Sequence, residues 1–297
     1  GQLMPPVMGA AAFIIAEYCN IEYLKVVKAA FVPAVVSYIA LMYITHLEAG
    51  KLGLKGLRKD QIPPFWSTFL KGIYNIIPIL FLIYELVFMR RSPQMAVFRA
   101  ISALAVLIVV QSIVTAVRAG HSPLDGLKAS GLLLWRSLVA GGKGMMGIGV
   151  AVSAAGIIVG VVTLGLGGII TEVIEVISGG NFILILIITA IACLLLGMGL
   201  PTTANYIVMA SLTAPVIVTL GARADVVFPL IAAHLFVFFF GILADDTPPV
   251  GLAAFAASAI ARSNPIKTGI QGFSYDIRTA LLPFMFIFNT DLLLVNV

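Results

Sequence analysis

Two polar stretches, Gly197-Met198-Gly199-Leu200-Pro201-Thr202-Thr203 and Ala244-Asp245-Asp246-Thr247-Pro248-Pro249, interrupt long apolar runs of this sequence. The apolar halves beside them hold about 15 residues each, whereas a helix needs about 20 to cross a bilayer. Backbone outside a helix is tolerated at membrane depth only where protein buries it or where it lines a water-filled cavity. The two stretches therefore predict a binding site at membrane depth, with two ordinary proline kinks as the alternative.

The overall composition is that of a membrane protein. Of the 297 residues, 61% are hydrophobic and 10% are charged, and the mean hydropathy is +1.10. A soluble domain carries about 25% charged residues, so this chain lacks the polar side chains to cover a soluble globule. These values exclude a cytosolic enzyme, a nucleic-acid binder and a disordered chain. Long apolar runs without strand-like alternation predict an all-α polytopic membrane protein with one membrane domain.

We expect the chain to be organised in four parts. They are 1–18, the end of a broken helix; 19–118, transmembrane spans; 119–143, an amphipathic interfacial helix; and 144–297, a second repeat. The interfacial helix is predicted because basic and apolar side chains interleave there. Within the second repeat we expect a Gly-rich span over 144–170, a re-entrant hairpin over 182–219, a broken helix over 226–261 and a last span over about 273–297.

An internal repeat connects the two ends of the chain. The stretch from Pro5 to Phe13 resembles the stretch from Pro248 to Phe255, at an offset of about 243–244 residues. Such an offset indicates two homologous halves. We count an even number of full spans between the two Pro-Pro elements, so the second copy runs opposite to the first. This is the inverted-repeat arrangement of many secondary transporters.

The same offset places a partner of residues 197–219 before Gly1. Both ends of the sequence look like cuts through a longer protein, so we expect the first repeat's hairpin to precede these residues. We also expect the 297 residues alone not to transport.

The interruptions carry a resemblance to a known family. The motifs Gly197–Tyr206 and Thr247–Gly251 resemble the large membrane subunit of tripartite ATP-independent periplasmic (TRAP) transporters, the DctM-like family. Gln2–Ala10 and His234–Val237 resemble the branch in which the small and large subunits are fused and the binding protein is of the TAXI type. The resemblance covers nearly the whole chain.

The resemblance implies an elevator-type secondary transporter rather than an enzyme. Such a protein imports an organic acid, a C4-dicarboxylate or similar anion, by symport with Na⁺ as the coupling ion. The implied partners are a periplasmic TAXI-type binding protein and a small membrane subunit fused upstream. The implied location is the cytoplasmic (inner) membrane of a bacterium or archaeon.

The resemblance also assigns residues to a sodium site in the second repeat. The assigned residues are Gly197, Gly199, Thr202, Thr203, Ala244, Thr247 and Pro249. Sodium prefers oxygen ligands, which free backbone carbonyls and Thr hydroxyls supply. Proline keeps such carbonyls free because it has no N–H to donate. A first site would retain only Gly1–Pro6 of its broken helix.

Other residues are candidates for substrate or for a second cation. Substrate contacts are assigned to four residues, Asn205, Pro201, Pro5 and Pro6, although Asn205 has an equal claim to staple the hairpin tip. Asp245 and Asp246 depart from the pattern of many relatives. Carboxylates inside an apolar stretch are functional candidates, and these two would hold a cation or carry a proton.

Three other functions stay open at the level of the sequence. A proton-coupled transporter of the same fold would use Asp245 and Asp246. An ion channel would line its pore with the same broken helices. An intramembrane enzyme has the least support, because the chain has no H-E-x-x-H zinc motif and no G-x-S-x-G elbow. We expect His234 to make an interhelical hydrogen bond rather than to carry a proton.

Overall fold

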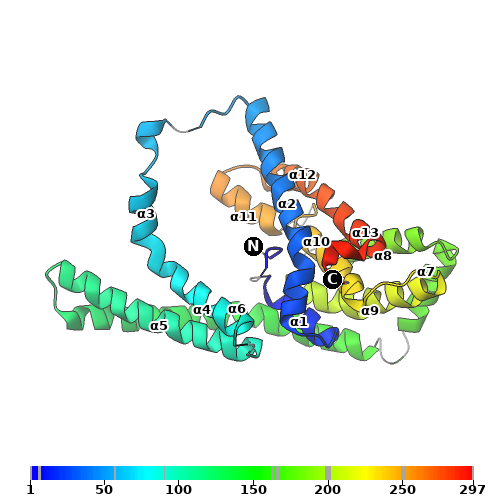
Figure 1. The fold of residues 1–297 in the computed structure, drawn as a ribbon, viewed down its shortest axis with the longest axis horizontal. Coiled ribbons are helices and arrows are strands. Elements are labelled where there is room, and N and C mark those ends of the chain that lie inside the picture. Colours follow the sequence, from blue (N-terminus) through cyan, green and yellow to red (C-terminus); the bar gives the residue numbers. More distant parts are fainter. Residues whose placement is uncertain are drawn as a thin grey trace. The chain divides into compact units, whose positions relative to one another are not determined.

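The computed structural model describes residues 2–5, 8–56, 58–89, 91–161, 164, 167–197, 202–248 and 252–295. Every regular element among these residues is a helix (Figure 1), which confirms the predicted all-α class. Within the described ranges, three helices are long and apolar enough to cross a bilayer: Tyr23–Lys51, Gln94–Arg118 and Asn205–Arg223. Three shorter apolar helices accompany them: Ile73–Val87, Phe182–Gly197 and Leu230–Ala244.

The chain forms two compact units. The first unit comprises Gly1–Leu52 and Ile148–Val297, and the second comprises Gly53–Gly147. The main helices of the first unit are α1 (Ala10–Tyr18), α2 (Tyr23–Lys51), α7 (Gly167–Ser178), α8 (Phe182–Gly197), α9 (Thr202–Arg223), α10 (Leu230–Ala244), α11 (Leu252–Ala261), α12 (Pro265–Asp276) and α13 (Leu281–Phe288). Two short 3₁₀ helices, η4 (Ile277–Ala280) and η5 (Thr290–Leu293), flank α13.

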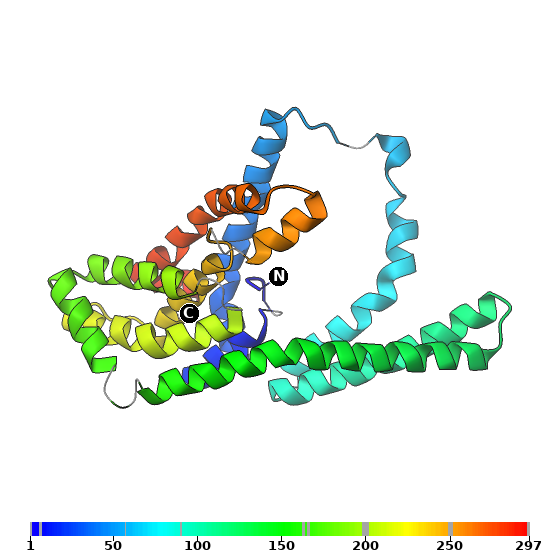
Figure 2. The same cartoon turned by 180° about the vertical axis from the view of Figure 1, so that it is seen from behind.

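Helix α10 is the centre of the first unit. It packs against α8, α9 and α13, and the two views of the ribbon show it enclosed by these helices (Figure 2). Its side chains are buried on all sides, including Phe236, Phe238 and Phe239. A helix that is hydrophobic all round belongs in a protein core, so the Phe-rich run is core rather than lipid-facing surface.

Local signals explain where the paired helices α8 and α9 begin. The Asn181 side chain accepts hydrogen bonds from the backbone N–H groups of Ile183 and Leu184, which caps α8. Gly179 and Gly180 before it have positive φ angles of 58° and 77°, a backbone conformation that glycine adopts without strain. The chain therefore turns at these glycines and passes from α7 into α8.

The two predicted repeat copies have the same local geometry. Helix α1 is followed by Asn20 with a φ of 50° and then by α2, whereas α11 is followed by Arg262 with a φ of 53° and then by α12. Asn20 and Arg262 are 242 positions apart, as are the first residues of α2 and α12. Ser37 and Thr279, also 242 positions apart, touch each other through their hydroxyls at 3.3 Å.

Helix α2 and the segment from α12 to α13 run antiparallel. Ser37 lies beside Thr279, whereas Lys28, earlier on α2, lines one cavity with Leu294, which comes later in the chain. Contact between equivalent residues in antiparallel segments is the signature of a local two-fold relation.

The second unit is built around a buried carboxylate. Its helices are α3 (Phe65–Gly72), α4 (Ile77–Val87), α5 (Pro93–Arg118) and the first part of α6 (Pro123–Val161), with 3₁₀ turns η1 (Lys59–Gln61) and η2 (Ile73–Ile76). The Glu85 side chain is 4% exposed and forms ion pairs with Arg91 at 2.9 Å and Arg99 at 3.3 Å. Two cationic partners compensate the loss of hydration of this carboxylate.

Two stretches of the chain divide into helices differently from their apolar pattern in the sequence. The apolar run 67–89, inside the region predicted to hold transmembrane spans, is not one helix, because the 3₁₀ turn η2 separates α3 from α4, and Pro78 lies in the first turn of α4. Proline has no N–H, so the first turn is the position in a helix where it costs least. Conversely, α6 continues without a break across the expected boundary between residues 143 and 144. Glycine weakens a helix by about 1 kcal/mol relative to alanine but removes no hydrogen bond.

The last predicted span is also divided. Helix α13 ends at Phe288, Asn289 has a non-helical conformation, and Asn289 then caps η5 by accepting from the Asp291 N–H. The apolar tail of the sequence thus continues as a short 3₁₀ helix up to Leu293 rather than as one helix.

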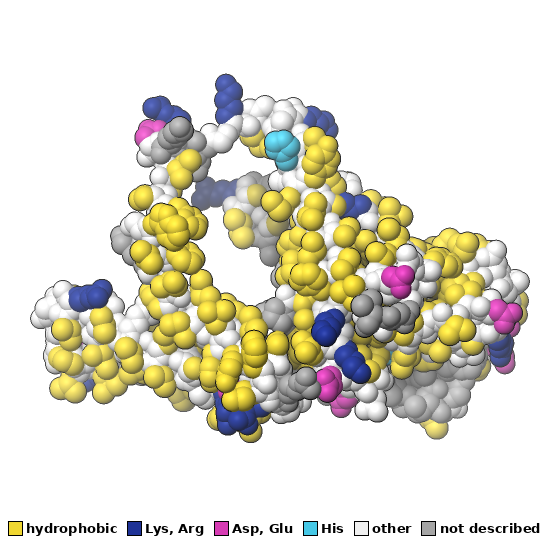
Figure 3. All heavy atoms as spheres, viewed as in Figure 1, with side chains coloured by type: hydrophobic (Ala, Val, Ile, Leu, Met, Phe, Trp, Pro, Cys, Tyr) yellow, Lys and Arg dark blue, Asp and Glu magenta, His cyan; other side chains and the backbone are white. Residues whose placement is uncertain are grey.

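Large apolar side chains on the outside agree with a lipid environment. Met42 of α2 and Phe98 of α5 are 72% and 67% exposed. In Figure 3, hydrophobic side chains cover most of the visible face of α2, and basic side chains lie near its two ends. This distribution is typical of a helix whose middle lies in hydrocarbon.

Candidate functional site

The second polar stretch forms a tight turn at the end of α10. The backbone N–H groups of Asp245, Asp246 and Thr247 each bond to the carbonyl three residues earlier. The Thr247 hydroxyl donates to the carbonyl oxygen of Leu243 at 2.9 Å. Pro248 follows and cannot donate a backbone hydrogen bond, so the helix stops here. The break predicted from the sequence is therefore present between α10 and α11.

The first polar stretch lies between α8 and α9, which pack against each other. Thr202 is the first residue of α9, and its Oγ1 contacts two acceptors: the Asp245 carboxylate and Gln2 Oε1, the latter at 2.6 Å. A threonine hydroxyl carries one hydrogen, so it can donate to only one of them at a time. Three chain segments far apart in the sequence meet at this hydroxyl.

Gln2 and Asp245 occupy corresponding positions in the two repeat copies. Gln2 lies three residues before Pro5 of the first Pro-Pro pair, and Asp245 lies three residues before Pro248 of the second. Both reach the same Thr202 hydroxyl, so the two repeat copies meet at the α8–α9 junction.

Asn205 ties the same junction to α10. Its side chain is fully buried, and Nδ2 donates to the carbonyl oxygen of Gly241 at 2.9 Å. A Cβ atom at Gly197 would lie 2.7 Å from Asn205 Oδ1 and 2.8 Å from the Ala244 Cβ, so only glycine fits there. The hydrogen bond from Asn205 to Gly241 corresponds to the structural role that the sequence analysis gave as the alternative to substrate binding. Asn205 Oδ1 itself has no hydrogen-bond partner among the described residues.

The structure brings several predicted site residues together and leaves others undescribed. Gly197, Asn205 and Ala244 are neighbours, and Thr202 contacts Asp245. Thr203 is partly buried in the first turn of α9, and Pro5 is buried. Four further candidates lie outside the described residues: Gly199, Pro201, Pro6 and Pro249, as does Gly1 of the first predicted site.

A cavity of about 320 Å³ opens beside the turn after α10. Asp245 and Asp246 line it on one side, and Asp276 and Arg278 line it from the end of α12 and from η4. Asp246 and Asp276 thus face the same cavity. The cavity therefore gathers three acidic side chains and one guanidinium.

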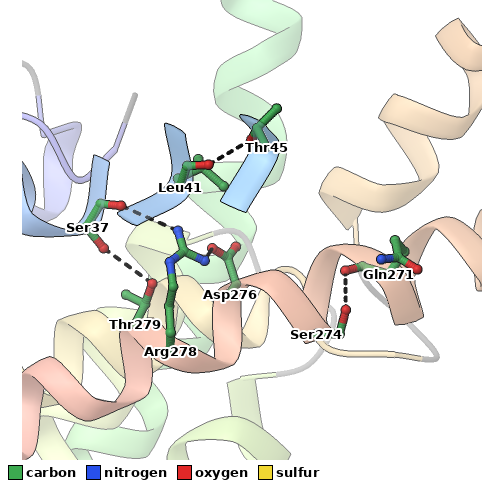
Figure 4. Close-up of polar contacts among 8 residues, drawn as sticks. All are labelled: Ser37, Leu41, Thr45, Gln271, Ser274, Asp276, Arg278 and Thr279. Carbon is green, nitrogen blue, oxygen red and sulfur yellow. Dashed lines mark hydrogen bonds and ion pairs between the residues drawn. The ribbon is translucent and has the colours of Figure 1, made fainter. Parts of the chain in front are cut away.

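Arg278 was missed by the sequence analysis. Its Nη1 lies 3.6 Å from Asp276 Oδ1, and its Nη2 donates to the Ser37 carbonyl oxygen at 3.4 Å (Figure 4). The sequence signal that could have indicated it is the Asp276-Ile277-Arg278 triplet just before an apolar run, because charged residues within membrane segments are functional candidates.

His234 makes the predicted interhelical contact. Its Nδ1 lies 2.8 Å from the Tyr206 hydroxyl of α9, and its ring lies edge-on to Tyr18 with centroids 5.9 Å apart. This hydrogen bond satisfies a buried polar group inside the helix bundle.

The described part of the chain contains no group of three or more His, Cys, Asp or Glu side chains arranged to hold a metal ion. A cation at this site would therefore depend on amide, hydroxyl and carbonyl oxygens in addition to carboxylates.

These features define a polytopic helical membrane protein in which a broken helix and a pair of packed helices meet beside a polar cavity. The whole chain, residues 1–297, matches the family described as "Tripartite ATP-independent periplasmic transporter, DctM component", and the protein belongs to this family. DctM proteins are transporter components, not enzymes, and work with a periplasmic binding protein and a small membrane subunit. No curated protein matches the chain. The expected family and the multi-pass membrane class are confirmed.

Proposed function

We propose that the protein is an elevator-type secondary transporter subunit that imports an organic acid anion, such as a dicarboxylate, together with sodium. The observation that carries the proposal is the meeting of Gln2, Thr202 and Asp245. It joins the two repeat copies and the α8–α9 junction at one point. In secondary transporters with inverted repeats, substrate and coupling ions bind at such an interface between broken helices.

The antiparallel repeat copies support the elevator proposal. The contact between Ser37 and Thr279 relates α2 to the segment after α12 across a local two-fold axis. We take α8 and α9 as a re-entrant hairpin, since α8 has only 16 residues and packs along α9. A helix of that length is shorter than the about 20 residues of a full crossing.

The described residues fit a sodium ion at the α8–α9 junction. Two buried oxygens there, Asn205 Oδ1 and Asp245 Oδ1, have no hydrogen-bond partner among the described residues. Uncompensated buried acceptors are rare because losing hydration without a partner costs free energy. A cation would satisfy both, with further oxygens from Thr202 and from the turn at Ala244 and Thr247. Gly197 allows the close approach of the two segments.

Proton coupling is the second candidate. The observation that favours it is that Asp245, Asp246 and Asp276 line one cavity, because neighbouring carboxylates repel each other and the binding of a proton relieves this repulsion. In this alternative Asp245 and Asp246 carry a proton in place of sodium.

The finer partner assignments also belong to this proposal. The motifs Gln2–Ala10 and His234–Val237 support a binding protein of the TAXI type and a small subunit fused upstream. The corresponding location is the inner membrane of a bacterium or archaeon.

The test is a sodium-dependent melting temperature of the full-length protein, with potassium at matched ionic strength as the control. A ligand that binds only the folded state stabilises it by about 2.7 kcal/mol at a hundredfold excess over Kd. We expect a sodium-specific rise that Thr202→Val weakens and Thr219→Val, on an exposed position of the same helix, does not. Equal effects of sodium and potassium on the wild-type protein would refute sodium coupling and favour the proton.

A further inference from the structure

Arg278 occupies an unusual position for a charged side chain. It projects from η4 into the wall of the cavity beside Asp245 and Asp246, and 19% of its side chain is exposed. Figure 4 shows the guanidinium between Ser37 of α2 and Asp276. It is the cationic side chain among the described residues that line this cavity.

The hydrogen-bonding capacity of Arg278 is largely unused. A guanidinium has five N–H donors in a planar fork. Here Nη2 makes one long hydrogen bond, at 3.4 Å, to the Ser37 carbonyl oxygen. Nε and Nη1 are buried and have no hydrogen-bond partner among the described residues, and the ion pair with Asp276 is loose at 3.6 Å. Buried N–H donors of a cationic side chain normally have hydrogen-bond acceptors, so the Arg278 guanidinium can bind a further acceptor.

A carboxylate is the acceptor that fits this fork. Arginine binds carboxylates through two parallel N–H···O bonds, which gives orientation as well as affinity. The Nη1 and Nη2 groups form the end-on edge of the guanidinium, and on this edge Nη1 makes no hydrogen bond and Nη2 makes only the long one to Ser37. The cavity of about 320 Å³ beside it has room for a small organic acid.

The comparison of the two repeat copies shows that Arg278 has no counterpart in the first copy. At the offset of 242, the positions corresponding to Asp276 and Arg278 in the first repeat copy are Ala34 and Val36. The first repeat copy thus has no counterpart of the Arg278 guanidinium.

We propose that Arg278 anchors one carboxylate group of the transported substrate and that Asp276 is a built-in competitor for the same guanidinium. In this structure the Asp276 carboxylate lies 3.6 Å from Arg278 Nη1. When substrate enters, its carboxylate binds the Nη1 and Nη2 edge of the guanidinium and displaces Asp276 from Nη1. The inference rests on the proposed function, because it assigns a substrate contact to the cavity of a transporter.

The variant Asp276→Asn distinguishes this competition from a purely structural role of the ion pair. If Asp276 and Arg278 only tie η4 to α2, Asp276→Asn weakens the fold and does not improve binding of any ligand. If Asp276 competes with substrate, Asp276→Asn removes the competitor and tightens carboxylate binding. Because the ion pair between Asp276 and Arg278 is long and partly exposed, we expect Asp276→Asn to lower the Kd for the carboxylate by about two- to fivefold.

The experiment measures the melting temperature of the full-length protein against ligand concentration at fixed sodium. The probes are succinate, butyrate and uncharged succinamide. We expect at least one of the two acids, but not succinamide, to raise the melting temperature of the wild-type protein. Arg278→Gln should raise the Kd of the responding acid at least about tenfold, because a charge-assisted pair is lost. Arg278→Lys should give an intermediate Kd, and Lys267→Gln, an exposed basic position on α12, should leave it unchanged.

The outcomes separate this inference from the proposed function. The assignment is overturned if neither acid responds, if Arg278→Gln binds the acid normally, or if Asp276→Asn weakens binding. Sodium titrations of the same variants give the independent readout. Retained sodium stabilisation with no acid response removes only the Arg278 assignment, whereas loss of sodium specificity with a normal acid response removes only sodium coupling.

Discussion

Thr202 and Asn205 lie within one helical turn of each other at the start of α9, yet they hold different partners. Thr202 contacts Gln2 and Asp245 from the two repeat copies, whereas Asn205 donates to Gly241 within α10. In an α-helix, residues three apart lie on the same face. One face of α9 thus positions both the α8–α9 junction and the turn after α10.

Gly197 is the residue whose size limits this arrangement. We expect Gly197→Ala to reduce the free energy of unfolding by about 1–3 kcal/mol, the usual cost of overpacking a well-packed interior. The added Cβ would lie 2.8 Å from the Ala244 Cβ and force the helices apart. Chemical denaturation in mixed micelles measures the effect.

A matched control for this change is Gly131→Ala. Gly131 lies inside α6, and an added Cβ there meets nothing within 4 Å. This substitution should be neutral or slightly stabilising, because alanine favours a helix. Equal destabilisation by both substitutions would show that close packing at Gly197 is not the cause.

At the level of elements, the stability of α8 depends on the cap at its N-terminus. Asn181 accepts from two backbone N–H groups of α8 that have no partner within the helix. Asn181→Ala should lower the free energy of unfolding by about 0.5–2 kcal/mol, whereas Asn181→Asp should retain the cap. The comparison uses the same micelle denaturation. A stability loss with Asp as large as with Ala would contradict the capping role.

The broken helix and the divided spans show how local sequence sets element boundaries. Pro248 ends α10 by preventing a continuing hydrogen bond, and Pro78 lies in the first turn of α4. The run from 124 to 161 has no proline, and α6 passes through its glycines without a break. Proline does not end every helix, however, because α2 continues through Pro33 and α9 through Pro215.

At the level of the whole molecule, the contact between Ser37 and Thr279 tests the relation between the repeat copies. In a protein with Cys19 and Cys193 replaced, we expect the pair S37C/T279C to form a disulfide on mild oxidation, since the hydroxyls are 3.3 Å apart. Proteolysis between the two positions followed by gel electrophoresis detects the link.

The control for this cross-link is T45C/T279C. Thr45 lies eight residues further along α2, about 12 Å along the helix axis. It should not cross-link under the same conditions. Efficient linking of the control pair, or no linking of S37C/T279C, would contradict the antiparallel placement of α2 and η4.

Much of the architecture could be predicted from the sequence because it depends on local and compositional physics. An apolar chain must satisfy its backbone hydrogen bonds internally, so the all-helical class follows from composition. The breaks at Thr202 and after Ala244 follow from proline, and the turn before α8 follows from two glycines and Asn181.

The candidate site depended more on tertiary structure. Asp245, Asp246 and Asn205 are visible in the sequence as polar residues inside apolar runs. Their partners are distant: Thr202 meets Gln2 across 200 positions, and Arg278 meets Ser37 across 241. No local signal encodes which distant residue fills such a contact. Only the packing of α2, α9, α10 and η4 decided that Arg278 and Asp276 share a cavity with the acidic pair, because their side chains meet only when these helices lie side by side.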